Sequence, residues 1–170
     1  MRRPGIEAPN NEVAVTVLGV GNPIMGDDGI GLALLSSVRD ACPSARVEYV
    51  DGGTGGMELI PVVQDARRLL VLDAVAGPVP GAVVEVVGDQ IKRLMSTKVS
   101  PHQLGLRDVF TAVRLLGREP QQVHVVGIVP QSVELRVGLS DVVGAAVPRA
   151  AGRAVEVITG WLDDEEGKAG

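Results

Sequence analysis

Short hydrophobic runs alternate with amphipathic stretches along most of the chain. Aliphatic runs bounded by glycine, proline or polar residues predict five strands. Between them, apolar residues at helical spacing predict helices, as at Ile30, Leu34 and Val38. The predicted strands are 13–20, 46–50, 68–72, 82–87 and 122–129, and the predicted helices are 29–41, 57–64, 106–116 and 141–162.

The order of these elements predicts an α/β fold. We expect three layers, α/β/α, with a mostly parallel five-stranded sheet and helices on both faces. The link at 77–81 (GPVPG) is too short for a crossover helix, so the fourth strand should run antiparallel to its predecessor. Ser140 should be the N-cap of the last helix, and Pro148 should kink or split that helix. Segment 89–101 predicts at most one helical turn.

The length of the chain favours one domain. A chain of 170 residues is long enough to bury a proper core. We expect a flexible leader at 1–12, a single α/β domain at 13–162 and a flexible charged tail at 163–170. Hydrophobic residues make up 45% of the chain but aromatic residues only 2%, which predicts an aliphatic core. Such a core is typical of a sheet that is buried on both faces.

Composition and charge exclude several classes of function. A net charge of -5 and the scarcity of aromatic residues argue against nucleic-acid binding. No stretch reaches the roughly 18 apolar residues of a membrane span, and the N-terminal residues lack the apolar core of a signal peptide. We therefore expect a cytoplasmic protein, and a monomer. The sole cysteine, Cys42, has no histidine near it in sequence, so a catalytic thiol is not expected.

A glycine-rich stretch at 19–31 (GVGNPIMGDDGIG) joins the first predicted strand to the first helix. Its glycines allow positive φ angles and a close approach of the backbone to a ligand. Asp27 and Asp28 stand at the helix entrance, where either could cap the helix. A dinucleotide-binding fingerprint would need a third glycine at Ile24, and no Walker-type Gly-Lys-Ser/Thr follows. This stretch is therefore not expected to bind a dinucleotide or a nucleoside triphosphate.

Three aspartates, Asp28, Asp51 and Asp73, follow the first three predicted strands. If these strands are parallel, the carboxylates lie along one edge of the sheet, where ligands bind in α/β folds. His102 lies in a segment expected to be irregular and long enough to reach the same edge. Carboxylates and imidazole together suit zinc, nickel, manganese or iron(II). Paired carboxylates alone could instead share a proton for acid–base work, or merely accept hydrogen bonds from backbone amides.

Other polar residues are weaker candidates for catalysis. Ser132 and Thr54 have no evident histidine partner, so a serine-type triad is not supported. His124 lies between two valines of the fifth predicted strand, where a structural histidine is expected. Since no serine or cysteine nucleophile is evident, a hydrolytic reaction would need a water molecule activated by a carboxylate or a metal.

Three stretches of the chain resemble the motifs of the hydrogenase maturation endopeptidases. The stretch 19–31 resembles their opening motif, and 51–59 (DGGTGGMEL) resembles their second motif. The stretch 100–106 (SPHQLGL) resembles their histidine motif in the form seen for uptake-type nickel-iron hydrogenases. The motifs occur in the family's order over residues 13–129, and the similarity continues more weakly into the last helix.

This resemblance implies an endopeptidase that removes a C-terminal extension from the large-subunit precursor of a nickel-iron hydrogenase after nickel insertion. The implied metal ligands are Asp28, Asp73 and His102. Asp51 matches a family position linked to cleavage or substrate binding, so Asp28, Asp51 and Asp73 are the candidate catalytic residues. The family is grouped with aspartic-type peptidases, and its nickel is regarded as arriving with the substrate. Zinc or another divalent metal could bind at the same residues in vitro.

Three alternatives remain open at this point. The first is an ordinary metallohydrolase that holds its own zinc or manganese and cleaves small peptides. The second is a metallochaperone that binds nickel without catalysis. The third is a germination-type protease, which shares the architecture but not the motif around His102. The polar leader is longer than the resemblance requires, and we expect residues 1–11 to be dispensable for activity.

Overall fold

The computed structural model describes residues 12–96 and 101–168, with backbone only at 94–96 and 101–104. The predicted leader lies almost entirely outside these ranges. The strands are β1 (Val15–Val20), β2 (Val47–Gly53), β3 (Arg68–Ala74), β4 (Val83–Val87) and β5 (Gln122–Ile128). The α-helices are α1 (Ile30–Ala41), α2 (Ile60–Asp65), α3 (Gln90–Ser96), α4 (Pro101–Leu115) and α5 (Asp141–Lys168). Single 3₁₀ turns, η1 (Gly26–Gly29) and η2 (Met57–Leu59), precede α1 and α2.

The five strands form one sheet in the order β2-β1-β3-β5-β4. The pairs β1–β2, β1–β3 and β3–β5 are parallel, and β4 pairs antiparallel with β5. The predicted mostly parallel sheet with one antiparallel strand is therefore confirmed. β4 runs opposite to β3, as expected, but β5 lies between them, because the chain returns from α4 to pair with β3.

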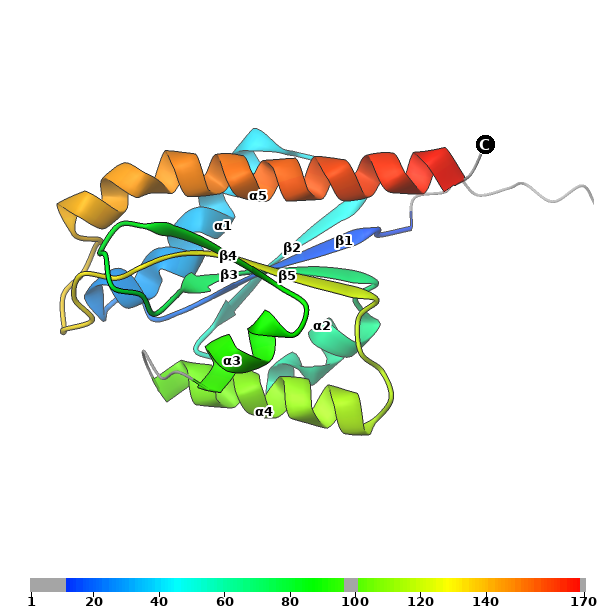
Figure 1. Ribbon diagram of the computed structural model, residues 1–170, viewed down its shortest axis with the longest axis horizontal. Helices are drawn as coiled ribbons and strands as arrows, with labels where there is room; N and C mark the ends of the chain where they lie inside the picture. The colour runs from blue at the N-terminus through cyan, green and yellow to red at the C-terminus, as the bar shows by residue number, and fades with distance from the viewer. Residues whose placement is uncertain (1–11, 97–100, 169–170) are drawn as a thin grey trace, which may run out of the picture.

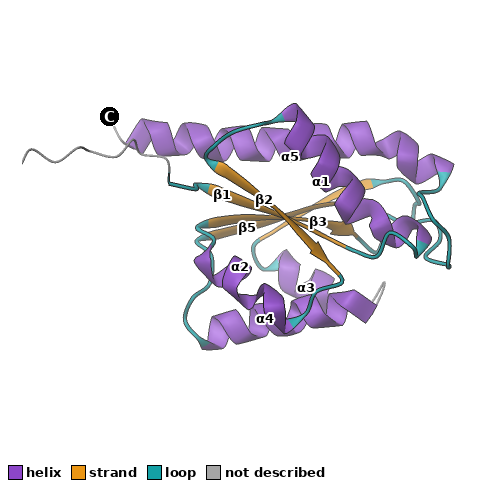
Figure 2. Ribbon diagram, turned by 180° about the vertical axis from the view of Figure 1, so that it is seen from behind, coloured by secondary structure: helices purple, strands orange, loops and turns teal. Residues whose placement is uncertain are grey.

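Helices cover both faces of the sheet, which completes the predicted three layers. Figures 1 and 2 show α1 and α5 on one face and α2, α3 and α4 on the other. Each face has its own hydrophobic cluster of aliphatic side chains. Aliphatic residues suit this arrangement, since a parallel sheet covered on both sides has no solvent-facing polar side.

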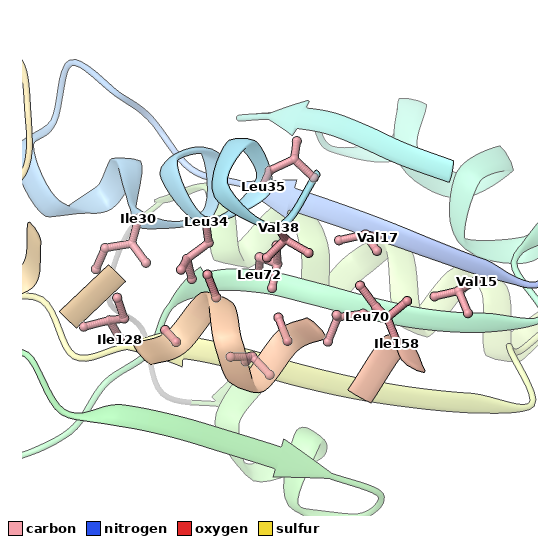
Figure 3. Close-up of a cluster of buried hydrophobic side chains, with 14 of the residues drawn as sticks. Val15, Val17, Ile30, Leu34, Leu35, Val38, Leu70, Leu72, Ile128 and Ile158 are labelled. Atoms are coloured by element: carbon pink, nitrogen blue, oxygen red, sulfur yellow. The ribbon is translucent and has the colours of Figure 1, made fainter. Parts of the chain in front are cut away.

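β3 illustrates why the central strands are hydrophobic throughout. All seven of its residues are buried. Leu70 and Leu72 belong to the cluster under α1 and α5, whereas Leu69 and Val71 belong to the cluster on the opposite face. This alternation follows the two-residue period of a strand. Figure 3 shows the first cluster, in which side chains of α1, β3 and α5 meet.

The segment around His102 differs from the prediction. The sequence predicts an irregular segment at His102 and a helix from 106 onward, but α4 already begins at Pro101. Proline is favoured in the first turn of a helix, because its fixed φ angle suits the helix and its missing N–H has no partner there anyway. The proline that indicates a loop in the sequence therefore marks a helix start.

α5 also differs from the prediction, because it is one continuous helix of 28 residues with Pro148 inside it. Pro148 is exposed, as is Gly144, the residue whose carbonyl the proline ring displaces. A proline on the solvent side of a helix leaves that carbonyl accessible to water. The buried side of α5 stays continuous through Val143, Ala146 and Ala150, which explains why the helix does not split.

Residues 163–168, which the sequence assigns to a flexible tail, form the last turns of α5. Ion pairs hold them against the sheet. Glu165 lies 3.1 Å from Arg67, 3.6 Å from Arg68 and 3.8 Å from Arg46, and Glu166 lies 3.4 Å from Arg46. These arginines precede or begin β2 and β3, so the acidic residues that suggest a solvated tail have partners far away in sequence.

Candidate active site

The edge where β1, β2, β3 and β5 end, here called the carboxyl edge, brings two of the predicted aspartates close together. Gly19 of β1 pairs in register with Asp51 of β2 on one side and Leu72 of β3 on the other. Asp73 is therefore one residue further along the neighbouring strand. Two strand spacings separate Asp51 from Asp73, which corresponds to about 10 Å.

The two carboxylates differ in their surroundings. Asp51 is exposed, and its Oδ1 accepts a hydrogen bond of 2.9 Å from the N–H of Gly53. Asp73 is buried, and its Oδ1 accepts one of 2.7 Å from the N–H of Ala74. Both therefore accept bonds from backbone amides, which is the purely structural role that the sequence left open. Asp51 is in addition open to solvent and to a substrate.

Asp28 lies directly above the end of β1. A Cβ at Gly21 would come within 2.0 Å of the Asp28 carbonyl oxygen, and Gly21 has a φ of 141°, a conformation that favours glycine. The N–H of Asn22 donates to Asp28 Oδ2 at 3.1 Å. Asp28 is 2% exposed. Gly21 thus lets the loop fold back onto the end of β1. The hydrogen bond from Asn22 then holds the Asp28 carboxylate at the carboxyl edge.

The start of α1 is inserted between the ends of β1 and β3. A Cβ at Gly31 would lie 2.0 Å from the Val20 oxygen and 2.3 Å from the Leu72 oxygen. Only a residue without a side chain permits this contact. Because Asp28 comes three residues before Gly31 and Asp73 directly after Leu72, this close approach places both residues at the same edge of the sheet.

Asp27 has a role that the sequence did not reveal. It is fully buried, and its carboxylate accepts four hydrogen bonds: 2.8 Å from the Gln131 N–H, 3.1 Å from the Ser132 N–H, 2.7 Å from the Ser140 N–H and 2.8 Å from the Ser140 hydroxyl. Burial by itself raises the pKa of Asp27, but these bonds outweigh it and hold the pKa below its ordinary value. Asp27 therefore ties the loop before α5 to the glycine-rich stretch.

Neither Asp27 nor Asp28 caps α1 as the sequence suggested, because the N-cap of that helix is Gly29. Ser140 does take the predicted position before α5, since its carbonyl accepts the Gly144 N–H at 2.8 Å. Its hydroxyl, however, donates to Asp27. The polar residues 131, 132 and 140, separated by more than a hundred positions from Asp27, gave no local sign of this contact.

The backbone of His102 lies in the first turn of α4, and its side chain is outside the described part of the structure. Gly105, one turn further on, approaches the loop that follows Asp51: a Cβ there would lie 3.2 Å from the Gly56 Cα and 3.5 Å from the Gly55 oxygen. The beginning of α4 therefore reaches the carboxyl edge, where Asp51 and Asp73 lie.

The donor chemistry of this edge suits a divalent transition metal. Two carboxylates and an imidazole are typical ligands of such ions. Among the side chains that the structure describes, no group of three or more histidine, cysteine, aspartate or glutamate residues could hold a metal by itself. A complete ligand set made of Asp28, Asp73 and His102 stays a prediction, as does the catalytic role of Asp51.

His124 and Cys42, for which the sequence predicts no catalytic role, lie outside the candidate active site. His124 of β5 is half-buried, and its Nε2 lies 3.2 Å from Glu85 Oε1 of β4. Glu85 in turn accepts hydrogen bonds of 2.9 and 3.2 Å from Arg153 of α5. Burial lowers the pKa of His124, more than Glu85 raises it. Cys42 follows the last residue of α1, at the end of that helix away from the carboxyl edge, and its carbonyl accepts the Tyr49 hydroxyl.

A groove of about 380 Å³ lies between α3 and α4, at the start of β5 and thus away from the carboxyl edge. It is lined by Gly88, Ile91, Lys92, Arg107, Phe110, Thr111, Arg114, Glu119 and Val123. Only one of these residues is a carboxylate, and none is a histidine or a cysteine. The groove therefore lacks the groups that hydrolysis requires, and the carboxyl edge remains the candidate active site.

Comparison with known proteins agrees with this fold. A family model described as hydrogenase maturation protease (HycI) matches residues 33–157. The hydrogenase 2 maturation protease of Escherichia coli is 36% identical over 140 residues, covering 80% of this chain and 85% of the relative. The hydrogenase expression/formation protein HoxM of Cupriavidus necator is 34% identical over 151 residues, covering 86% and 75%.

Solved structures give the same result. The hydrogenase maturating endopeptidase HybD from Escherichia coli superposes with a TM-score of 0.79 at 34% identity, covering 85% of this chain and 91% of that one. The nickel-iron hydrogenase maturation protease HybD from Thermococcus kodakarensis superposes with a TM-score of 0.70 at 27% identity, covering 84% and 97%.

These matches define the class of protein as an endopeptidase with a three-layer α/β/α fold, in which the sheet is the middle layer. The chain belongs to the hydrogenase maturation protease family. The resemblance stated from the three motifs is confirmed. None of the helices in ranges 12–96 and 101–168 combines the length and the apolar character needed to cross a membrane.

Proposed function

We propose that this protease removes the C-terminal extension of the large-subunit precursor of a nickel-iron hydrogenase after nickel has been inserted. The observation that carries the proposal is the position of the motif aspartates. In a member of this protease family, the exposed Asp51 and the buried Asp73 lie at the ends of the parallel strands β2 and β3, and the buried Asp28 lies in the turn η1 that follows β1, the strand between them.

The nickel belongs to the substrate in this proposal. Asp28, Asp73 and His102 contact the substrate's nickel, and the protease thereby distinguishes a loaded precursor from an empty one. Buried carboxylates support this role, since burial makes an ionised carboxylate costly unless it is hydrogen-bonded or paired with positive charge. Zinc or another divalent cation that binds these residues in vitro would compete with the loaded precursor.

Hydrolysis then needs an activated water molecule, in keeping with an aspartic-type or metal-assisted peptidase. Asp51 is the exposed carboxylate of the set, so it is the group best placed to accept a proton from the attacking water. The oxygen of that water forms the new bond to the peptide carbonyl carbon. The C–N bond breaks, and the proton passes to the leaving amine. The products are a new C-terminus and a free peptide.

The test is an incubation of the protease with the nickel-loaded large-subunit precursor from the same source. Intact mass spectrometry follows the C-terminus of the precursor. We expect the loss of one defined C-terminal peptide with the wild type, and no loss with nickel-free precursor. His102→Ala, Asp73→Asn and Asp51→Asn should each abolish the mass change. Asp89→Asn is the matched control, since Asp89 is an exposed aspartate distant from the carboxyl edge, and it should cleave like the wild type.

Each other outcome has a defined meaning. Equal cleavage of nickel-free and nickel-loaded precursor would contradict the substrate-borne nickel and favour a protease with its own metal or none. Nickel binding without any change in the mass of the precursor would favour a metallochaperone. Cleavage that survives in all three site variants would show that the carboxyl edge is not the active site.

A further inference from the structure

Three large aliphatic side chains are exposed beside the candidate active site. Leu135 is 79% exposed, Val137 is 81% exposed and Ile24 is 52% exposed. We call these three residues the apolar rim. Leu135 and Val137 lie in the loop between β5 and α5, and Ile24 lies in the glycine-rich stretch 19–31. Exposed apolar groups that gather at one place commonly mark an interaction site.

Backbone hydrogen bonds hold the two parts of the rim together. The Arg136 N–H donates to the Ile24 oxygen at 3.0 Å, and the Gly26 N–H donates to the Arg136 oxygen at 2.7 Å. Met25 and Arg136 form a parallel β-bridge. Residue 136 stands between the two exposed side chains of the loop, so these bonds fix Leu135 and Val137 on either side of it.

The loop is anchored again at both of its ends. The Asp27 carboxylate accepts hydrogen bonds from Gln131 and Ser132 at the start of the loop and from Ser140 at its end. The Asp27 N–H also donates to the Ser132 oxygen at 2.9 Å. The exposed leucine and valine are therefore presented on a fixed scaffold.

The same stretch of chain carries the rim and the site. Ile24 precedes Asp28 by four residues, and the loop follows the end of β5 at the carboxyl edge. Figure 1 shows the segment between β5 and α5 at the end of the molecule where α1 begins, and Figure 2 shows it there from behind. Because the loop is hydrogen-bonded to Ile24 and Gly26, the rim lies on the same segment as Asp28, one of the candidate carboxylates.

We propose that the apolar rim is the docking surface for the folded part of the hydrogenase large-subunit precursor, which contacts it through an apolar patch next to the cleaved bond. The inference rests on the proposed function and adds the residues that select the substrate. Its occupant follows from continuity with the candidate site: the proposed substrate is itself a protein, and the rim includes Ile24 of the glycine-rich stretch that also carries Asp28. The rim contributes binding energy, while Asp28, Asp51 and Asp73 do the chemistry.

The test uses the double variant Leu135→Ser/Val137→Ser in steady-state cleavage of the nickel-loaded precursor. We expect KM to rise about tenfold or more, because two aliphatic anchors are lost, with kcat within about twofold of the wild type. Leu135→Met/Val137→Ile, which keeps the apolar surface, should retain the wild-type KM. Thermal unfolding of all variants should match the wild type, since both side chains are exposed.

The chain offers a matched control at its other end. Leu115 is 84% exposed and Leu116 is 60% exposed, at the end of α4 that is away from the carboxyl edge. Leu115→Ser/Leu116→Ser removes a comparable exposed apolar area and should leave both KM and kcat unchanged. An equal rise of KM in both double variants would contradict the inference, because the effect would then be non-specific.

Failure of the inference can be told apart from failure of the proposed function. Normal cleavage with an unchanged KM in the rim variant overturns the inference and leaves the function standing. No cleavage by the wild type overturns the function, and binding of precursor to immobilised wild type and rim variant then tests the rim alone, where equal binding overturns it. Sedimentation that shows a wild-type dimer dissociated by the rim substitutions would assign the rim to a second copy of this chain, and would also overturn the inference.

Discussion

Asp27 shows how one carboxylate can organise two distant segments. Its four hydrogen bonds come from residues 131, 132 and 140, which precede α5, while Asp27 itself precedes α1. A carboxylate accepts at both oxygens, whereas an amide presents an N–H₂ group to donors that need an acceptor. The neighbouring Asp28 lies at the carboxyl edge, so under the proposed function two adjacent aspartates have different roles: Asp27 holds the loop before α5, and Asp28 contacts the substrate's nickel.

We expect Asp27→Asn to lower the free energy of unfolding by about 1.5–3 kcal/mol at neutral pH, because hydrogen bonds to a charged acceptor are lost. The pKa of Asp27 lies below its ordinary value of 3.8, so the stabilisation is complete above that value and disappears as the pH falls through the lower, folded-state pKa. Urea unfolding at several pH values measures this. Asp40→Asn, at an exposed position, should change stability little at any pH. A wild-type advantage that stays constant down to pH about 2 would contradict the assignment.

The helix α1 depends on glycine for its place in the fold. Gly31 is helical, and its missing side chain lets the first turn of α1 touch the ends of β1 and β3. This contact sets where Asp28 lies relative to Asp73. A helix that moved outward by the width of a methyl group would carry Asp28 with it.

Gly31→Ala should therefore destabilise the protein by about 3 kcal/mol or more, because the new Cβ meets two backbone oxygens that cannot move aside. Activity on the nickel-loaded precursor should fall as well. Gly152→Ala is the matched control, since Gly152 lies in α5 with open space where a Cβ would be added. That substitution should be neutral or stabilise by up to about 1 kcal/mol, owing to the higher helix propensity of alanine. Similar effects of both substitutions in denaturant titrations would refute the close-approach argument.

The elements could be predicted from the sequence wherever a hydrophobic period or a glycine turn marked them. All five strands follow from short aliphatic runs, the parallel direction of β1, β2, β3 and β5 follows from the intervening helices, and the antiparallel direction of β4 follows from the short link before it. The errors at Pro101 and Pro148 share a cause: proline removes one hydrogen bond, and only the surrounding structure shows whether that bond was needed. At Pro101 the position is a first turn, and at Pro148 it is the solvent side of a long helix.

The candidate site was predictable to a different extent. Asp51 and Asp73 could be placed from sequence, since the ends of neighbouring parallel strands meet at one edge. The contacts of Asp27 and the exposure of Leu135 could not be predicted, because both depend on how the loop before α5 packs against the glycine-rich stretch, more than a hundred residues away in sequence. A signal for the rim was nevertheless present, as Leu135 and Val137 belong to the segment 133–139 (VELRVGL), in which aliphatic residues alternate with polar residues or glycine although the segment lies outside every predicted strand.

α5 connects the two ends of the molecule, and its last turns stabilise the end opposite the site. Glu165 lies against three arginines, among which Arg68 is 5% exposed in its side chain. A buried guanidinium is costly when its carboxylate partner is removed. Glu166, by contrast, is 74% exposed and contacts only Arg46 among the residues described.

We expect Glu165→Gln to lower the free energy of unfolding by about 1–3 kcal/mol. Glu166→Gln should change it by less than about 0.5 kcal/mol, because an exposed ion pair contributes little. Chemical denaturation of the two variants beside the wild type decides this. Equal stability of all three proteins would mean that residues 163–168 contribute no more than the flexible tail expected from the sequence.

The length of α5 has a practical consequence for handling the enzyme. Its 28 residues span about 42 Å, from Asp141 near the carboxyl edge to Lys168 beside the starts of β2 and β3. An affinity tag, a fluorophore or a chip surface attached after Lys168 is therefore held a whole protein diameter from the carboxyl edge. Immobilised in this orientation, the protease would present its candidate active site to the solution, where a protein substrate can approach it freely.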